Sequence, residues 1–194
     1  MLLDRAINRD VFVDIMNAHG IECVLVSQDE FKKRYSRLTS SFTTTHHCSR
    51  DNVYYYTRDI DLRSMYHELG HLVVWDLVGR PKYHNFGCCG GYDLMATRSE
   101  RLYARVIGPV KGPNFCAVEL GPCAIEAVLL RLNRKSNKTV FSQLQSQNWI
   151  SEESRRNGHT YRKARAILDA MLIIGNALIE EHQEKHRQQG SLVQ

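Results

Sequence analysis

The sequence lacks the long apolar runs and leader segments that direct proteins into or across membranes. Its apolar stretches are far shorter than the roughly 20 residues that a membrane-spanning helix needs. Its first residues show no basic lead followed by an apolar block, the pattern of a secretory signal peptide. No internal repeat is present either, which argues against a solenoid or propeller. We therefore expect a cytoplasmic protein with no membrane partner.

Cysteine is present, but the spacing of a thiolate metal site is absent. None of the six cysteines forms a Cys-x2-Cys pair, and Cys88 and Cys89 are adjacent. A zinc cluster built on thiolates is therefore not expected. In a reducing compartment, cysteines with this spacing are ordinarily free thiols.

Basic residues are in modest excess, and no nucleic-acid-binding motif accompanies them. The formal net charge is +5, and the excess is concentrated in residues 131–138 and 155–165. No RNA-binding aromatic motif lies beside either stretch, so no specific nucleic-acid partner is expected. The two stretches are interpreted either as ordinary solvated faces or as docking surfaces for an acidic macromolecule.

The chain does contain a succession of helical and strand patterns of single-domain size. Its 194 residues, 43% of them hydrophobic, suit one domain with a core at residues 2–183 and a polar tail at 184–194. Apolar periodicity and turn residues predict these elements in order: a helix over 2–18 ended by Gly20, a strand over 21–26, a polar loop over 35–52 and a strand over 53–56. Four helices are predicted after them: one capped by Asp59 or Asp61 and ended by Gly79 and Pro81, a short one near 99–106, one over 123–132 with Pro122 at its start, and one over 161–183. We predict a mostly helical α+β fold, with a small sheet packed on the helices.

The first of these four helices carries His67-Glu68-Leu69-Gly70-His71, an H-E-x-x-H motif. Residues four apart lie one above the other on a helix, so His67 and His71 can bind one metal ion together. Two histidines that only form hydrogen bonds are the alternative, but a capped amphipathic helix directly after a strand favours a metal site that the helix lines. The extended motif with a third histidine is excluded, since Val74 and Leu77 occupy the positions of its glycine and histidine.

A third protein ligand is needed to hold the ion while leaving positions open for chemistry. Glu119 is the preferred candidate because its apolar sequence surroundings make an unpaired carboxylate costly. His84 and Glu100 stay open as alternatives. Glu126 is expected beside the site as the partner of a ligand, if its helix begins early enough.

The motif alone leaves the metal and the chemistry open. With zinc, Glu68 is the general base of a metallopeptidase, and Tyr83, His84 or Tyr92 are candidates for stabilising the oxyanion. With iron and a carboxylate ligand, the two histidines complete a two-His-one-carboxylate site that activates oxygen. A non-enzymatic interaction protein that keeps a metal only for stability is a third interpretation.

Several segments resemble, in order, the elongation factor P hydroxylase family, non-haem metalloenzymes that hydroxylate the modified lysine of that translation factor. The similar segments are the helix beginning at Phe12 with the strand after it, the motif ending at His71, Gly79-Arg80 with Asn85-Phe86-Gly87, and the segment from Phe115 to Glu126. The resemblance covers residues 12–132. It implies ferrous iron bound by His67, His71 and Glu119, Glu68 close by in the catalytic site, and an acidic protein substrate.

The chain departs from the family pattern at four positions expected to line the site. Leu72 stands where the family has tryptophan, and Gly121 where it has lysine. Asn85 and Cys116 replace acidic residues. These departures bear on the substrate more than on the metal. An iron-dependent protein hydroxylase acting on a lysine-type side chain is therefore the predicted function, and a zinc metallopeptidase is the alternative. The pattern predicts neither an organic co-substrate nor an oligomeric state.

Overall fold

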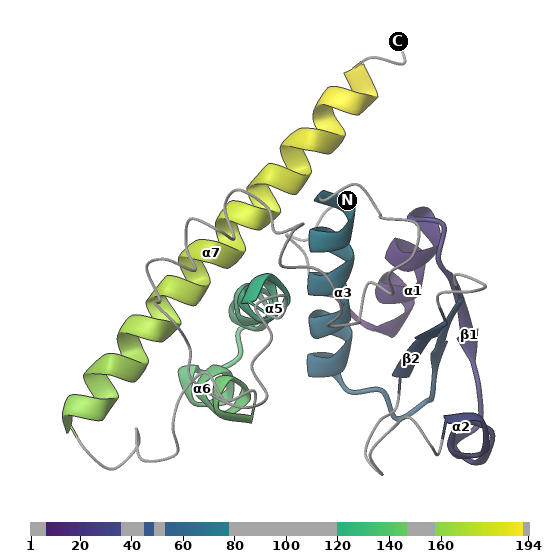
Figure 1. The fold of residues 1–194 in the computed structure, drawn as a ribbon, viewed down its shortest axis with the longest axis horizontal. Helices are drawn as coiled ribbons and strands as arrows, with labels where there is room; N and C mark the ends of the chain where they lie inside the picture. The colour runs from purple at the N-terminus through teal and green to yellow at the C-terminus, as the bar shows by residue number, and fades with distance from the viewer. Residues whose placement is uncertain (1–6, 36–44, 49–52, 78–119, 147–157, 192–194) are drawn as a thin grey trace.

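The computed structural model describes residues 7–35, 45–48, 53–77, 120–146 and 158–191 (Figure 1). They form the helices α1 (Arg9–Ala18), α2 (Gln28–Tyr35), α3 (Leu62–Leu77), α5 (Leu120–Leu132), α6 (Asn137–Ser146) and α7 (Gly158–Ser191). The strands are β1 (Glu22–Leu25), β2 (Thr45–Cys48) and β3 (Val53–Tyr56). Most of these residues are helical, which confirms the predicted mostly helical α+β class.

The three strands form one small mixed sheet in the order β1-β3-β2. β1 runs parallel to β3, and β2 runs antiparallel to it. The predicted strands over 21–26 and 53–56 are confirmed, but the predicted loop over 35–52 is wrong at residues 45–48, which form β2. This strand is polar, and it is held at the sheet edge by pairing with β3, a contact that local sequence does not reveal.

Helix α1 begins later than predicted. Asn8 caps it, because the Asn8 side-chain oxygen accepts a hydrogen bond of 2.9 Å from the Val11 backbone N–H. Helix α1 therefore starts at Arg9, and the part of the predicted helix at residues 2–6 lies outside the described residues. Its end is as predicted, since Gly20 follows it with a φ of +72° that residues other than glycine rarely adopt.

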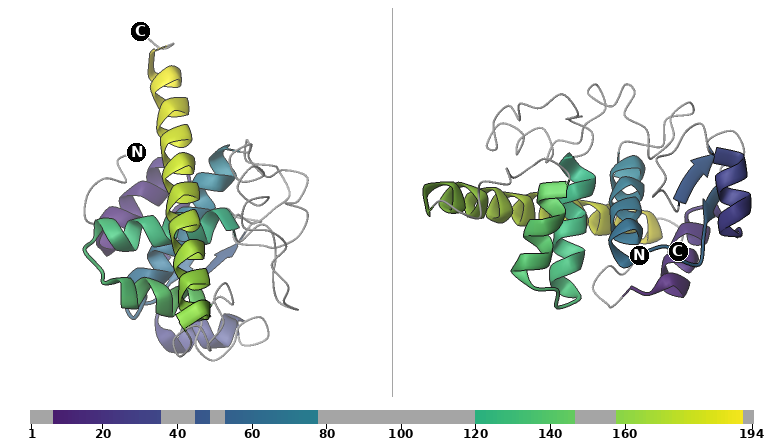
Figure 2. Two further views of the ribbon diagram at one scale, coloured as in Figure 1. Left: turned by 90° about the vertical axis from the view of Figure 1, so that its left-hand side faces the viewer. Right: turned by 90° about the horizontal axis from the view of Figure 1, so that it is seen from below.

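Helix α5 is the centre of the helical layer. Every residue from Leu120 to Leu130 is buried, because α5 lies between α3 and α7 (Figures 1 and 2). The helix begins two residues before Pro122, which we expected at its first position; proline is tolerated throughout the first turn, where the backbone N–H has no partner within the helix. A Cβ atom on Gly175 of α7 would collide with the Ala124 carbonyl oxygen, so α7 meets α5 backbone to backbone.

Helix α7 is longer than its apolar pattern predicts. We expected it over 161–183 followed by a polar, frayed tail, but it continues through Ser191. The prediction that the tail is frayed is therefore wrong for residues 184–191. Polar residues at the exposed end of a long helix retain helical propensity even though they contribute no apolar face. Pairs such as Arg187 with Glu184, 2.7 Å apart, add modest support.

The sheet lies across α3 from α7 and is held by α1 (Figure 1). Phe12 of α1 meets Tyr54 of β3 edge to face, with ring centroids 5.5 Å apart. The core continues from there through Tyr66, Leu69 and Leu72 of α3 into α5. None of the described helices is long and apolar enough to cross a membrane. The predicted short helix near 99–106 lies outside the described residues.

Candidate metal centre

The helix that carries the H-E-x-x-H motif is fixed at its start by a side-chain cap. Asp61 precedes its first residue, Leu62, and Asp61 Oδ1 accepts a hydrogen bond of 2.7 Å from the Ser64 backbone N–H. Of the two predicted caps, the structure thus selects Asp61 over Asp59. Both motif histidines fall in the middle of α3, away from its two ends.

The two imidazoles of the motif come together as the spacing predicts. His67 Nε2 and His71 Nε2 are 3.1 Å apart, and the two rings stand nearly perpendicular. Ligand atoms of a tetrahedral ion held at ~2.0 Å lie ~3.3 Å apart, so this spacing suits a shared ion. His71 is buried, and the His67 side chain keeps 24% exposure, which leaves a path from solvent.

Glu126 of α5 lies against the opposite edge of the His67 ring. Its Oε2 is 3.2 Å from His67 Nδ1, and its side chain is 1% exposed. An Nδ1–H that donates to this carboxylate fixes the tautomer in which Nε2 carries the lone pair for a metal. The expectation that Glu126 lies beside the site as a ligand's partner therefore matches the observed contact.

Cys123 is a site residue that the sequence did not reveal. One donor atom each from His67, Cys123 and Glu126 lie within 4.8 Å of one another. Cys123 is a buried thiol. The sequence has no second cysteine at metal-ligand spacing, so Cys123 was not predicted as a ligand. Its place one turn before Glu126 on a buried helix is the signal that was available. His67, Cys123 and Glu126 are therefore a second possible set of metal ligands, which competes with the pair His67 and His71.

The other predicted site residues are placed only in part. Glu68 follows His67 on α3 and is half-buried. The predicted third ligand, Glu119, lies outside the described residues, as do the alternative ligands His84 and Glu100 and the two tyrosines considered for the oxyanion. The structure thus brings together His67, His71 and Glu126, while the assignment of Glu119 stays a prediction.

The chain matches no family model, no curated protein and no solved structure. The resemblance to the elongation factor P hydroxylase family therefore rests on the order of its motifs and stays a prediction.

Proposed function

We propose that this chain is a metal-dependent enzyme, and specifically a non-haem iron hydroxylase that acts on a lysine-type side chain of an acidic protein such as elongation factor P. One observation carries the metal: His67 Nε2 and His71 Nε2 are 3.1 Å apart, and Glu126 holds the far edge of His67. The hydroxylase chemistry is drawn from the motif order and from the carboxylate at Glu119.

In this proposal each residue of the site has a defined task. His67 and His71 bind the ion through Nε2, and Glu119 adds the carboxylate that favours iron over a purely imidazole site. Ferrous iron, when bound there, supplies the activation of dioxygen. The Nδ1–H of His67 donates to Glu126, which keeps the ring oriented and raises its basicity. Glu68, which follows His67 and is half-buried, can hold a water molecule or a proton at the ion.

An acidic substrate fits the charge displayed near the end of α5. Arg134, Lys135 and Lys138 are exposed in the turn that leads into α6 and in its first residues. Such a basic surface steers an acidic protein toward its docking position, with a rate that falls as salt rises. The surface adds affinity for the partner and has no part in the chemistry.

A zinc metallopeptidase is the second candidate, and the position of Glu68 favours it. In hydrolases with this motif the glutamate takes a proton from metal-bound water, which requires a carboxylate beside the ion that water can reach. Glu68 follows His67 directly and is not fully buried. The two candidates share the metal position and differ in the metal and in the fate of the substrate.

Metal identity and substrate mass separate the two candidates. The full chain is purified with and without oxygen, its metal is determined by mass spectrometry, and it is incubated with elongation factor P, ferrous iron, dioxygen and ascorbate. We expect stoichiometric iron, oxygen consumption and the gain of one oxygen atom on a lysine side chain, all lost in His71→Ala. Tightly held zinc, together with cleavage of a casein-type substrate that Glu68→Gln abolishes, would replace the hydroxylase with the peptidase.

A further inference from the structure

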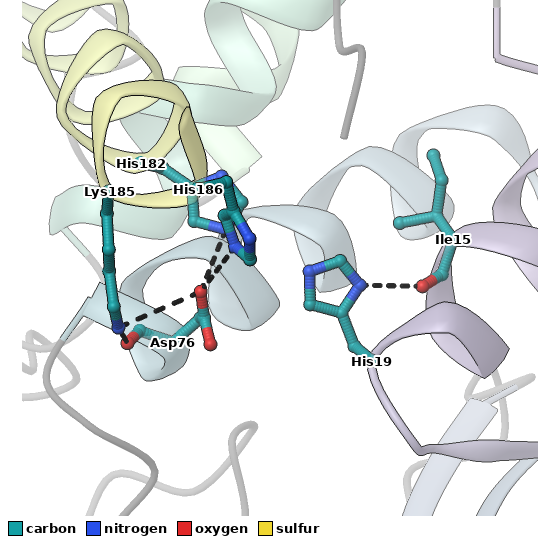
Figure 3. A network of polar contacts seen from close by, with 6 residues as sticks. All are labelled: Ile15, His19, Asp76, His182, Lys185 and His186. Atoms are coloured by element: carbon teal, nitrogen blue, oxygen red, sulfur yellow. Dashed lines mark hydrogen bonds and ion pairs between the residues drawn. The ribbon is translucent and has the colours of Figure 1, made fainter. Parts of the chain in front are cut away.

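A second group of metal-binding side chains lies outside the motif, where α1, α3 and α7 meet. It consists of His19, Asp76, His182 and His186, which we call the three-helix cluster; one donor atom from each lies within 4.8 Å of the others. Three of the four residues are buried, and His186 is partly exposed. Figure 3 shows the imidazoles of α7 above the Asp76 carboxylate, with His19 facing them from the end of α1.

His19 is held in place by the end of α1. It is the C-cap residue, and the turn after it closes with a hydrogen bond of 3.0 Å from the Ile21 backbone N–H to the Met16 carbonyl oxygen. His19 Nδ1 lies 2.8 Å from the Ile15 carbonyl oxygen, to which it donates. A neutral imidazole that donates through Nδ1 carries its lone pair on Nε2, the nitrogen on the cluster side of the ring (Figure 3). This is the arrangement of a metal-ligating histidine.

His182 and His186 repeat on α7 the four-residue spacing of the H-E-x-x-H motif. Their Nε2 atoms are 3.2 Å apart. Asp76 Oδ2 lies 3.1 Å from His182 Nε2 and 2.8 Å from His186 Nε2. Three donor atoms from two helices thus form a small triangle, with edges close to the ~3.3 Å of a tetrahedral zinc site.

Asp76 occupies a buried position near the C-terminal end of α3. It is the penultimate residue of α3, where the helix dipole is negative, and its side chain is only 9% exposed. Lys185 donates to the Asp76 carbonyl oxygen and lies 3.9 Å from Oδ2. The Asp76 carboxylate is therefore buried against two imidazoles of α7, with one ammonium group nearby.

A polar network without a metal is the competing explanation. In it, His182 and His186 would each donate an Nε2–H to the same Asp76 oxygen. That arrangement accounts for the Asp76 contacts, and in it the His19 ring, held by Ile15, packs against the rings of His182 and His186 with centroids 6.0 and 5.7 Å apart. A metal at the centre of the cluster accounts for all four side chains at once.

We propose that His19, Asp76, His182 and His186 form a second metal site, independent of the His67–His71 pair, which binds a zinc-type divalent ion and joins α1, α3 and α7. Three imidazoles and one carboxylate make a complete tetrahedral set. Four protein ligands leave no position for a substrate, so this ion is structural.

Counting bound ions in the full chain tests the site. Chelator-treated protein is titrated with Zn²⁺, separated from free metal, and analysed by mass spectrometry. The His186→Ala and His182→Gln variants are expected to bind one ion fewer than the wild type, and to lose the thermal stabilisation that Zn²⁺ gives at this site. Gln189→Ala, an exposed change on the same helix, serves as the matched control and retains every ion. His71→Ala removes the other ion and leaves this one.

Unchanged zinc stoichiometry in folded His186→Ala overturns the proposal. Should that variant fail to fold, Co²⁺ binding to the His71→Ala protein decides, because cobalt in a tetrahedral nitrogen–oxygen site absorbs strongly in the visible range. Absence of bound cobalt in that protein would also overturn the site. If the His67–His71 pair instead holds no metal, the wild type binds one ion that His186→Ala removes and His71→Ala does not. The two proposals therefore fail separately.

Discussion

Gly70 of α3 lies directly against Pro122 of α5, so close that a Cβ atom on residue 70 would come 2.5 Å from the Pro122 carbonyl oxygen. Real Cβ atoms do not approach a backbone oxygen to this distance, so only glycine permits the present packing of the two helices. The same packing brings His67 within 3.2 Å of Glu126. Gly70 thus allows the close packing of α3 on α5 that places Glu126 against His67.

Gly70→Ala is expected to move α3 away from α5 and to weaken metal binding at the His67–His71 pair. Overpacking of this kind costs about 1–3 kcal/mol of unfolding free energy. The matched control is Gly175→Ala, which collides with the Ala124 carbonyl oxygen on the α7 side of α5. Urea denaturation should show both variants destabilised, whereas metal titration should show reduced affinity at the pair for Gly70→Ala alone. Equal metal affinity in the two variants would contradict the role given to Gly70.

Glu126→Ala is expected to lower the metal affinity of the His67–His71 pair by roughly 10–100-fold, because removing the partner of a ligating histidine leaves its ring unoriented. Competition with a chromophoric chelator measures the affinity. Cys123→Ala removes the neighbouring thiol and should leave the affinity unchanged. If Cys123→Ala instead abolishes binding and His71→Ala does not, the ion lies at the Nδ1 edge of His67, against our assignment.

The third ligand is tested by a pair of glutamates. Glu119→Ala should strip the ion from purified protein, since a site of two imidazoles alone holds iron weakly. Glu100→Ala should retain it. Metal content per chain, determined on freshly purified variants, gives the answer, and the reverse pattern would transfer the ligand role to Glu100.

Asp61→Ala is expected to lower the unfolding free energy by about 1 kcal/mol, the usual cost of losing a helix N-cap. The reason is the loss of the hydrogen bond from the Ser64 backbone N–H at the start of α3. Asp59 is exposed two residues earlier, and Asp59→Ala should change stability by no more than ~0.5 kcal/mol. Thermal or urea unfolding of the two variants checks this, and similar losses would mean that the cap is shared.

Cys23 is expected to resist alkylation in the folded protein. Burial, and then the nearby Glu22 charge, raise the pKa of its thiol to about 12, so very little reactive thiolate exists at neutral pH. The reaction with iodoacetamide at pH 8 should be at least ~100-fold slower than in urea, where the thiol regains its ordinary pKa. Peptide-resolved mass spectrometry follows this cysteine separately. A rate equal to that of the unfolded chain would show that the strand does not protect it.

The elements that were predicted correctly are those whose ends are set by nearby residues in the sequence. The glycine at position 20, the aspartate at 61 and the β-branched and aromatic run at 53–56 each act within a few residues of themselves. Strand β2 was missed because its polar residues pair with β3 from across a loop. Helix α2 was missed because its composition is almost entirely polar apart from Phe31, which is buried.

The motif histidines were predictable for the same reason, since a four-residue spacing within one helix needs no tertiary information. The partnership of His67 with Glu126 depends on the packing of α3 against α5, which the sequence suggests only as a possibility. His182 and His186 have the same spacing as the motif histidines. They were not predicted as a pair, because the apolar pattern of α7 fades near residue 183 and His186 lies beyond the predicted end of the helix. Asp76, the carboxylate that both histidines contact, lies more than a hundred residues away in the chain.

That separation has a consequence for how the chain folds. The hydrogen bond between Asp76 and His186 spans 110 residues, and His19 lies farther still from its neighbours on α7. Contacts this distant form only after a large loss of chain entropy, and they slow folding. The junction of α1, α3 and α7 is therefore expected to assemble last, after residues 182–186 have been synthesised and α7 has docked on α5. A growing chain would hold His19 and Asp76 without their partners until that moment.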